Sequence, residues 1–259
     1  MTRIAVIGAS DAGLRLGVAL LSAGAEVVGF DLAPAEFLPI PLATSLEEVA
    51  AADVVLNFST PQLAEKTSQE IAPLLKAGAI YADFSAGTPE QKKRTSGLFP
   101  EGVYADVALS PTGALEAAGT GAQALSDVLA PLGTDVSVIS VIPGDAATRT
   151  LIRTLLTNGV AEVVADTLWA AESLGIEDWA WQDIKDQFTA LNGDAAQALI
   201  DDTAHNFKRH QMAMQDVVEL LAGSGYDSTM IAPIQFTHGR IMHGKKIPHS
   251  HTPTTKWKK

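Results

Sequence analysis

Residues 1–31 read MTRIAVIGASDAGLRLGVALLSAGAEVVGFD, and this stretch decides the fold of the first half of the chain. The run at 3–8 is short and apolar, which is typical of a buried strand. A turn bounded by glycines follows, then an apolar helix pattern at 14–23 and a second apolar strand at 26–30 that ends at Asp31. This order predicts a strand–turn–helix–strand unit that opens a parallel α/β sheet.

The turn carries Gly8 and Gly13 at the first and last positions of the dinucleotide-binding pattern G-x-G-x-x-G, with Ser10 at the middle one. Gly8 permits the tight turn, and Gly13 lets helix and strand pack closely, while the helix N-terminus offers N–H groups to a pyrophosphate. Asp31 can accept hydrogen bonds from a ribose 2′-hydroxyl and would repel a 2′-phosphate. The pattern therefore predicts NAD as the cofactor, in preference to NADP. The competing interpretation is an ordinary glycine-rich turn. The residues expected to contact the cofactor here are Gly8, Ser10, Asp11, Ala12, Gly13, Asp31 and Leu32.

Composition limits the function classes. The chain has 259 residues, which allows one large domain or two small ones. It has no cysteine, which excludes disulfides and thiolate catalysis and is typical of the cytoplasm. A net charge of −12 argues against nucleic-acid binding. No apolar run has transmembrane length, and the chain opens on a strand instead of a signal peptide. We expect a cytoplasmic protein with no membrane partner and no metal site.

Strands and helices alternate through the first half of the chain, and helical patterns alone follow. Buried strands that alternate with helices indicate a doubly wound parallel sheet. We therefore predict an α/β Rossmann domain at 1–142 and a smaller all-helical domain at 143–259. The further strands are expected at 54–58, 79–84, 103–107 and 136–142, and the further helices from Pro61 and Pro89 and at 123–132, 147–174, 179–191, 195–222 and 230–242.

Four segments at the ends of these strands carry a resemblance to a known superfamily. They are IAVIGASDAG at 4–13, NFSTP at 57–61, YADFSAGTP at 81–89 and DVALSPT at 106–112. In this order and spacing they resemble the β-hydroxyacid dehydrogenases, which include the 3-hydroxyisobutyrate and 6-phosphogluconate dehydrogenases. The size of the helical domain is similar to the branch of 6-phosphogluconate-dehydrogenase-like proteins that have a compact C-terminal domain.

The resemblance implies roles for the polar residues that follow the strands, because ligands of open α/β sheets bind at the carboxyl ends of the strands. Ser110 would bind the substrate carboxylate. An alternative for Ser59 and Ser85 is helix capping, since each precedes a helix that starts with proline. Further cofactor contacts are expected from Asn57, Phe58, Ser59, Thr60 and Ser85, and further substrate contacts from Thr112, Arg153 and Asn158.

The superfamily's catalytic lysine is missing from its usual place. The family pattern G-x-G-x-x-x-K-x-x-x-N, counted from Gly144, puts Thr150 where the lysine belongs and Thr154 where the asparagine belongs. Threonine has no accessible pKa near neutrality, so it could only orient a water molecule. Arg153 stays protonated and can bind a carboxylate, but it cannot act as a base.

Three explanations for this departure stay open. Asp216, His205 or His210 could transfer the proton; Asp216 aligns with the aspartate of the family's K-D pair, in which Gln215 replaces the lysine. The substrate could be an iminium ion that needs little acid help, as in imine reductases, which share the fold and also lack the lysine. The chain could also bind a dinucleotide without turnover.

We therefore predict an NAD(P)-dependent oxidoreductase that transfers hydride between the nicotinamide and a small hydroxyacid, carbonyl or imine. The expected catalytic residues are Ser110, Thr150 and Asp216. The alternatives are an imine-reductase-like enzyme and a non-catalytic dinucleotide-binding protein. We also expect a homodimer formed through the helices at 145–174 and 195–222, because the helical domain is too small to cover its long apolar helix.

Overall fold

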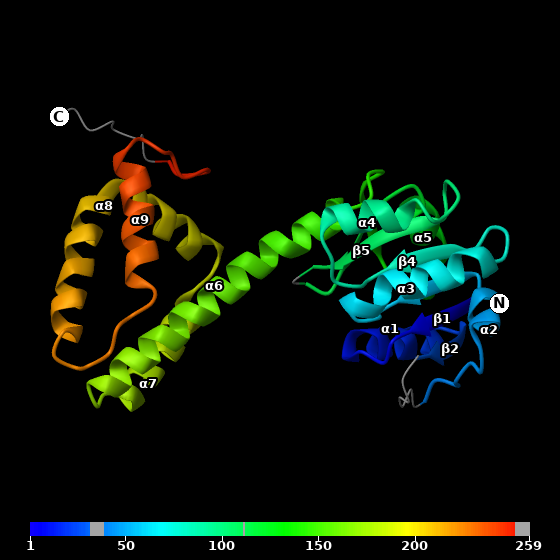
Figure 1. The fold of residues 1–259 in the computed structure, drawn as a ribbon, viewed down its shortest axis with the longest axis horizontal. Helices are drawn as coiled ribbons and strands as arrows, with labels where there is room; N and C mark the ends of the chain where they lie inside the picture. Colours follow the sequence, from blue (N-terminus) through cyan, green and yellow to red (C-terminus); the bar gives the residue numbers. More distant parts are fainter. Residues whose placement is uncertain (32–38, 111, 252–259) are drawn as a thin grey trace. The chain divides into compact units, whose positions relative to one another are not determined.

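The computed structural model describes residues 1–31, 39–110 and 112–251, and the chain divides into two compact units, Met1–Thr154 and Leu155–Lys259 (Figure 1). We call these the first and the second unit. The division falls inside the long helix α6, Asp145–Ser173, which begins in the first unit and ends in the second. The domain boundary expected at 142/143 precedes this helix and stays a prediction.

The described residues of the first unit form a seven-stranded sheet in the order β2-β1-β3-β4-β5-β6-β7. Strands β1 to β5 are parallel, which confirms the predicted Rossmann-like sheet. Strand β6 was not predicted; it runs antiparallel to β5, and β7 runs parallel to β6, so the far edge of the sheet is reversed. The strands are β1 Arg3–Ile7, β2 Glu26–Phe30, β3 Val54–Asn57, β4 Ile80–Asp83, β5 Tyr104–Leu109, β6 Leu115–Ala118 and β7 Val136–Ser140.

Helices cover both faces of this sheet, because the buried strand residues alternate between two cores. Ile4 and Val6 of β1 pack with Leu20 and Leu125 from helices α1 and α5. The intervening β1 residues pack on the other face with side chains from α2 and α3. The helices of this unit are α1 Asp11–Ser22, α2 Leu46–Ala50, α3 Pro61–Ile71, α4 Pro89–Ser96 and α5 Ala122–Leu129, with short 3-10 turns η1 Ala72–Leu74 and η2 Ala130–Leu132.

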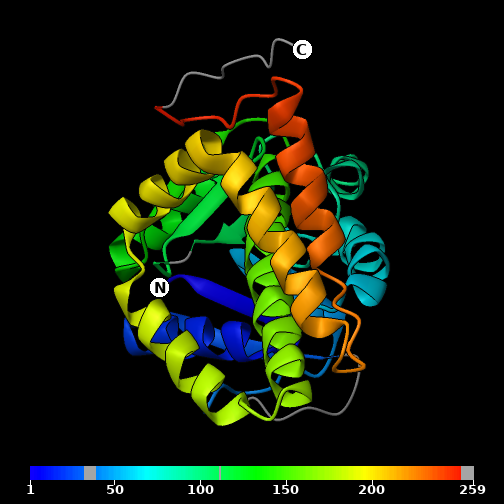
Figure 2. The same cartoon turned by 90° about the vertical axis from the view of Figure 1, so that its left-hand side faces the viewer.

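All regular elements among the described residues of the second unit are helices, as predicted. They are the C-terminal part of α6, then α7 Glu177–Ala190, α8 Gly193–Leu221 and α9 Ile231–Met242. Helix α8 bends at Asn206, whose backbone angles are not helical. Figures 1 and 2 show α8 and α9 side by side, and the two helices pack against each other. No helix among the described residues combines the length and the apolar character that a membrane span requires.

A buried aspartate on α6 holds the loop that leads into α9. The Asp166 carboxylate accepts hydrogen bonds from Tyr226 Oη at 2.8 Å, Ser228 Oγ at 2.6 Å, and Thr229 N at 3.0 Å. Burial raises the pKa of Asp166, but the hydrogen bonds from these residues outweigh it and leave the pKa below its usual value. The charged carboxylate therefore stabilises the folded second unit.

Replacing Asp166 by alanine is expected to lower the free energy of unfolding of the second unit by about 3 kcal/mol, because three partly buried hydrogen bonds to the buried carboxylate are lost together. A group with a lowered folded pKa stabilises the protein above its unfolded pKa and loses this effect as the pH falls through the folded pKa. Urea unfolding should therefore show the full difference from the wild type at pH 7 and a smaller one below about pH 4. Asp227→Ala, at an exposed position of the same loop, is the control. A difference that does not change with pH would contradict this role of the charge.

Candidate functional site

The fingerprint turn is fixed by backbone contacts to the neighbouring strands. Gly8 has a φ of +91°, which favours glycine, and its N–H donates to the carbonyl of Phe30 at 2.9 Å. The carboxylate of Asp31 accepts a hydrogen bond from Ala9 N at 3.0 Å. Asp31 therefore stands directly beside the turn, at the end of β2, where the sequence analysis expects an acid.

The N-terminus of α1 opens at this turn. Ser10 is the N-cap residue, and its hydroxyl accepts a hydrogen bond from Gly13 N at 3.1 Å. Asp11 is exposed and pairs with Arg15 at 2.6 Å. The first N–H groups of a helix have no acceptor inside the helix, and the helix dipole is positive at that end. This terminus thus has the groups that bind an anion such as a pyrophosphate.

Close packing at the two glycines presses α1 onto the end of β3. A Cβ added to Gly8 would lie 2.7 Å from the backbone C and O of Phe58, and one added to Gly13 would lie 3.0 Å from the Phe58 ring. The Phe58 ring stacks on Phe84, from the end of β4, with ring centroids 4.2 Å apart and planes inclined by 19°. The glycines thus hold the turn against a flat aromatic pair at the carboxyl edge of the sheet.

A cavity of about 310 Å³ lies at this edge, inside the first unit. It is lined from the fingerprint turn, the ends of β3 and β4, helix α4, strand β5 and the N-terminal turns of α6. Its position at the carboxyl ends of parallel strands is where open α/β sheets bind ligands. We call it the edge cavity. Its lining residues include Ser10, Ala12, Phe58, Ser59, Phe84, Ser85, Lys92, Asp106 and Thr150.

Some of the residues that are predicted to contact the cofactor line the edge cavity. Phe58, Ser59 and Ser85 line it, together with Ser10 and Ala12 from the turn. Asn57 is fully buried beneath them, and its side-chain oxygen accepts a hydrogen bond from Ser59 N at 3.0 Å. Thr60 is exposed, and Leu32 lies outside the described residues.

The capping alternative for Ser59 and Ser85 is wrong. The N-cap residue of α3 is Thr60, and that of α4 is Thr88, which forms a capping box with Gln91. Each cap stands one or more residues beyond the serine that the sequence suggested, because the helices start at their prolines. Ser59 and Ser85 are both 8% exposed.

Beneath the edge cavity lies a cluster of buried charged residues that the sequence analysis missed. Lys92 Nζ lies 3.0 Å from Asp83 Oδ1 and 3.6 Å from Asp106 Oδ1, and the three side chains are at most 3% exposed. Tyr104 Oη donates to Asp83 Oδ2 at 2.8 Å. We call Asp83, Lys92 and Asp106 the buried charge cluster. A buried lysine is uncommon unless it is paired with carboxylates, and this lysine also lines the edge cavity.

Asp106 connects this cluster to the start of α6. Its Oδ2 accepts hydrogen bonds from Gly144 N at 3.1 Å and Ala147 N at 3.0 Å, as a carboxylate does at a helix N-terminus. Its buried Oδ1 has no hydrogen-bond partner among the described residues. Burial raises the pKa of Asp106, and the Lys92 ammonium and the two N–H groups offset this only in part.

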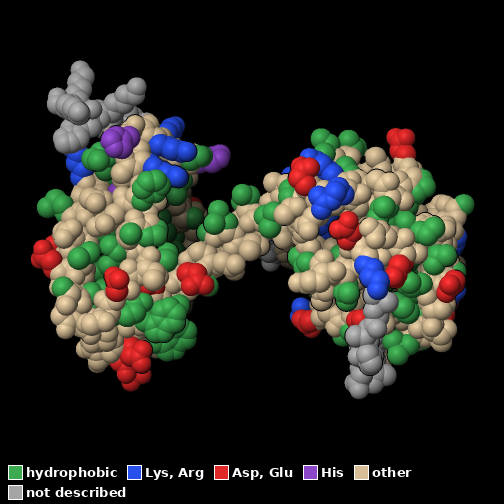
Figure 3. All heavy atoms as spheres, in the orientation of Figure 1, with side chains coloured by type: hydrophobic (Ala, Val, Ile, Leu, Met, Phe, Trp, Pro, Cys, Tyr) green, Lys and Arg blue, Asp and Glu red, His purple; other side chains and the backbone are tan. Residues whose placement is uncertain are grey.

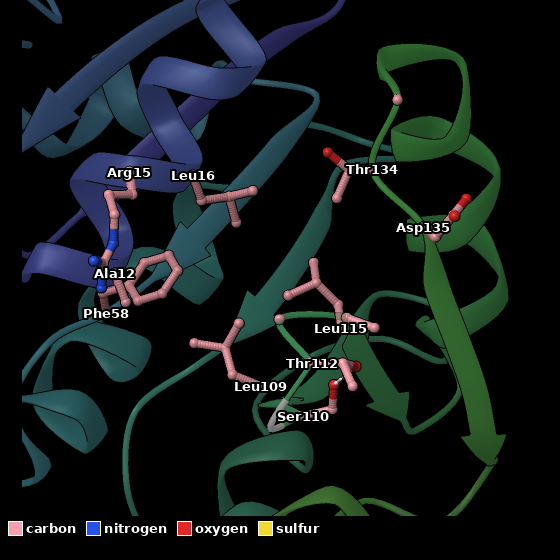
Figure 4. Close-up of a pocket in the computed structure, with 13 residues that line it drawn as sticks. Ala12, Arg15, Leu16, Phe58, Leu109, Ser110, Thr112, Leu115, Thr134 and Asp135 are labelled. Atoms are coloured by element: carbon pink, nitrogen blue, oxygen red, sulfur yellow. Dashed lines mark hydrogen bonds between the residues drawn. The ribbon is translucent and has the colours of Figure 1, made fainter. Parts of the chain in front are cut away.

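A second, larger cavity of about 700 Å³ lies next to the first and shares Ala12, Phe58 and Leu109 with it. Figure 4 shows its walls: α1 on one side, the β5–β6 connection with Ser110 and Thr112 below, and Thr134 and Asp135 opposite. The hydroxyls of Ser110 and Thr112 are 2.8 Å apart. The predicted substrate residues Ser110 and Thr112 therefore lie together and line this larger cavity, which meets the edge cavity at Leu109.

Three predicted substrate or catalytic residues lie on α6. Thr150 lines the edge cavity, and its hydroxyl donates to the Ala146 carbonyl at 3.2 Å. Arg153 donates to the Leu109 carbonyl at 3.3 Å and forms an ion pair with Glu116. The charge of Arg153 is thus already matched within the first unit. Asn158 belongs to the second unit and is exposed there.

Asp216 also belongs to the second unit, where it is an exposed residue of α8. His210, a second candidate for proton transfer, lies with its Nε2 2.8 Å from Asp202 Oδ2 on the same helix. Their roles stay predictions.

Comparison with solved structures identifies the fold. The chain is similar to an imine reductase from Myxococcus stipitatus solved with NADP+, with a TM-score of 0.78 and 17% identity over 93% of this chain and 95% of that one. It is similar to a reductive aminase from Aspergillus terreus solved with NADPH and ethyl levulinate, with a TM-score of 0.75 and 14% identity over 95% of each chain. A conserved protein of unknown function with structural similarity to 3-hydroxyacid dehydrogenases gives a TM-score of 0.55 and 24% identity over 92% of this chain and 96% of that one.

No family model and no curated protein matches the sequence. The structural likenesses nevertheless cover nearly the whole chain, and they confirm the predicted fold, a Rossmann-like domain followed by a helical domain.

Proposed function

We propose that this protein is an oxidoreductase that uses a nicotinamide dinucleotide, with NAD preferred, to reduce or oxidise a small carbonyl, hydroxyacid or imine. The observation that carries the proposal is the edge cavity. It combines the dinucleotide-type turn, the stacked Phe58–Phe84 pair and a set of polar groups at the carboxyl edge of the sheet.

The residues present fit a dinucleotide. The N-terminus of α1, with Ala12 and Gly13, would hold the pyrophosphate, and Asp31 would accept from the adenosine ribose. Phe58 and Phe84 both line the edge cavity and give it an apolar aromatic wall that suits a planar ring. Such a cofactor supplies a hydride donor or acceptor, so the protein's own groups have to orient the substrate and handle a proton.

For the substrate, Ser110 and Thr112 are the proposed orienting hydroxyls. The two groups face the larger cavity and are already within hydrogen-bond distance of each other. Arg153 could bind a substrate anion only in competition with Glu116. The roles of Asn158 and Asp216, which belong to the second unit, stay predictions.

The test is a turnover panel. The purified chain, with NADH or NADPH, is offered small ketones, cyclic imines and N-methylated cyclic iminium ions, and with NAD+ or NADP+ it is offered hydroxyacids. Absorbance of the reduced nicotinamide reports the reaction. Turnover of at least one class is expected. Dinucleotide binding without turnover of any class would instead support the non-catalytic alternative.

An imine-reductase-like enzyme is the second candidate. The favouring observation is that Thr150 lines the edge cavity at the place where the resemblance to hydroxyacid dehydrogenases puts a lysine. An iminium ion is already charged and needs no acid to accept a hydride. Faster turnover of iminium ions than of ketones in the panel would favour this candidate.

Replacing Asp31 by alanine is expected to weaken NAD binding about 10–100-fold, since a hydrogen bond to a charged group contributes about 1.5–3 kcal/mol. It should also narrow the preference for NAD over NADP. Because Asp31 also accepts from Ala9 N, Asp31→Asn is the matched variant: it keeps an acceptor for the turn and removes the charge. Calorimetry measures the affinities of the wild type and of both variants for NAD and for NADP. An unchanged NAD affinity in Asp31→Ala would refute the assignment.

We further propose a homodimer. Large apolar side chains on α6 and α8 are exposed in the single chain, and Figure 3 shows hydrophobic side chains over the visible face of the second unit. Light scattering should give twice the mass of one chain, and a charge introduced by Leu155→Glu should lower it to one; a monomeric wild type would refute the proposal. The exposed side chains include Leu155, Leu156, Val163, Leu199, Met212 and Leu220.

A further inference from the structure

The edge cavity contains a lysine, Lys92, even though Thr150 occupies the position where the family pattern has one. Lys92 lines the same cavity from a different helix, α4, and its side chain is only 3% exposed. Helix α4 is held at its start by the Thr88–Gln91 capping box. A helix with a capped N-terminus therefore places a buried ammonium group in the wall of the edge cavity.

The surroundings of Lys92 favour an extra proton. Its ammonium faces two carboxylates, Asp83 and Asp106, so the buried charge cluster has a net charge of −1 when all three groups are ionised. Asp106 Oδ1 is buried without a hydrogen-bond partner among the described residues. A carboxylate in this situation gains stability by holding a proton, and the raised pKa of Asp106 agrees with this. The cluster thus lowers the cost of placing a proton on Asp106, next to Lys92.

The Ser85 hydroxyl offers a path from Lys92 to the cavity. Lys92 Nζ lies 3.3 Å from Ser85 Oγ and 2.6 Å from the Ser85 carbonyl oxygen. Ser85 Oγ in turn donates to Asp83 Oδ1 at 2.5 Å. A hydroxyl can rotate, so it can accept a proton from one partner and donate its own to another. Ser85 lines the edge cavity and therefore meets both requirements of a relay.

We propose that Lys92 supplies the proton for carbonyl reduction in the edge cavity, through the Ser85 hydroxyl, with Asp106 as the group that restores it. This inference rests on the proposed oxidoreductase function. It assigns to α4 the chemical role that Thr150 on α6 cannot fill.

In this step the carbonyl carbon accepts a hydride with its two electrons from the reduced dinucleotide, which is oxidised. The C=O π bond breaks, and its electron pair stays on oxygen. This oxygen takes the Ser85 hydroxyl proton, Ser85 takes one from the Lys92 ammonium, and the Lys92 amine recovers a proton from Asp106, which is reprotonated from solvent. An N-methylated iminium ion accepts the same hydride and needs no proton.

The two substrate classes therefore give the test. In Lys92→Arg the positive charge remains, but a guanidinium does not release its proton. The rate for the best ketone of the panel should fall about 100-fold or more, the usual range for a lost general acid, while the rate for the best N-methylated iminium ion should stay within about threefold. Lys92→Met should show the same split, and so should Lys92→Met combined with Asp83→Asn, should the single variant not fold. Lys93→Met, an exposed neighbour on the same helix, should change neither rate.

Dinucleotide affinity, measured by calorimetry without substrate, is the second readout and should be the same in Lys92→Arg as in the wild type. The proposal would be overturned if Lys92→Arg lowered the rates for the ketone and the iminium ion equally, or lowered neither rate. A large loss of dinucleotide affinity would also overturn it. In each case Lys92 would not be the group that supplies the proton. A wild type that turns over no class of the panel, hydroxyacids included, would instead refute the proposed function itself, a result that is read before any variant is made.

Discussion

Replacing Lys92 by methionine is expected to lower the free energy of unfolding of the first unit by about 3–5 kcal/mol. The reason is that the substitution removes the only positive charge of the buried charge cluster. Asp83 and Asp106 are 2% and 1% exposed and would remain, so at least one would be ionised without a partner. Lys92 also donates to the backbone carbonyls of Asp83 and Ser85, at 3.2 Å and 2.6 Å, and these acceptors would lose a donor.

The variant is compared with two others. Lys93→Met removes the neighbouring lysine, whose pair with Glu90 is exposed, and should change stability by less than about 1 kcal/mol. Adding Asp83→Asn to Lys92→Met removes one charge of each sign and should recover at least half of the loss. All four tryptophans lie after residue 168, so their fluorescence follows the second unit, whereas hydrogen exchange at the backbone amides of β1 to β5 follows the first. Equal effects of Lys92→Met and Lys93→Met would show that the cluster does not contribute to stability.

The sequence was sufficient for the elements that follow a regular apolar pattern. The Gly8–Gly13 turn and Asp31 lie as expected, because glycine spacing and an acid after the second strand are local signals. The helices of the second unit were placed within a few residues of their observed ends. Strand β6 was missed because Leu115–Ala118 reads LEAA, which has no β-branched or aromatic residue, so its composition does not indicate a strand.

The candidate site was harder to predict, because its charged part depends on contacts between separate elements. Lys92 is one of two adjacent lysines in a polar helix, and no sequence pattern distinguishes the buried one from the exposed Lys93. The available signal was the pair of acids in buried strands, Asp83 at the end of β4 and Asp106 within β5, since buried carboxylates seldom lack a partner. The family pattern expects a lysine on α6, whereas the fold brings one to the same cavity from α4.

Replacing Gly8 by alanine is expected to cost about 2–5 kcal/mol of stability in the first unit and to weaken dinucleotide binding by more than tenfold. Two effects add. A φ of +91° is unfavourable for a residue with a Cβ, by about 1–2 kcal/mol. The new Cβ would also lie 2.7 Å from the Phe58 carbonyl and 2.9 Å from Ser59 N, so the end of β3 has to move, at about 1–3 kcal/mol.

Gly24→Ala separates these two effects. Gly24 has a φ of +93°, almost the same as Gly8, but a Cβ added there meets no atom within 4 Å. This control should therefore show the conformational cost alone, and it should leave dinucleotide affinity unchanged because it lies at the other end of α1. The stability difference between the two variants measures the close packing of the fingerprint turn on Phe58. If Gly8→Ala and Gly24→Ala were equally stable and bound the dinucleotide equally well, then the close packing would be irrelevant to the site, and the cofactor assignment would lose its structural basis at this turn.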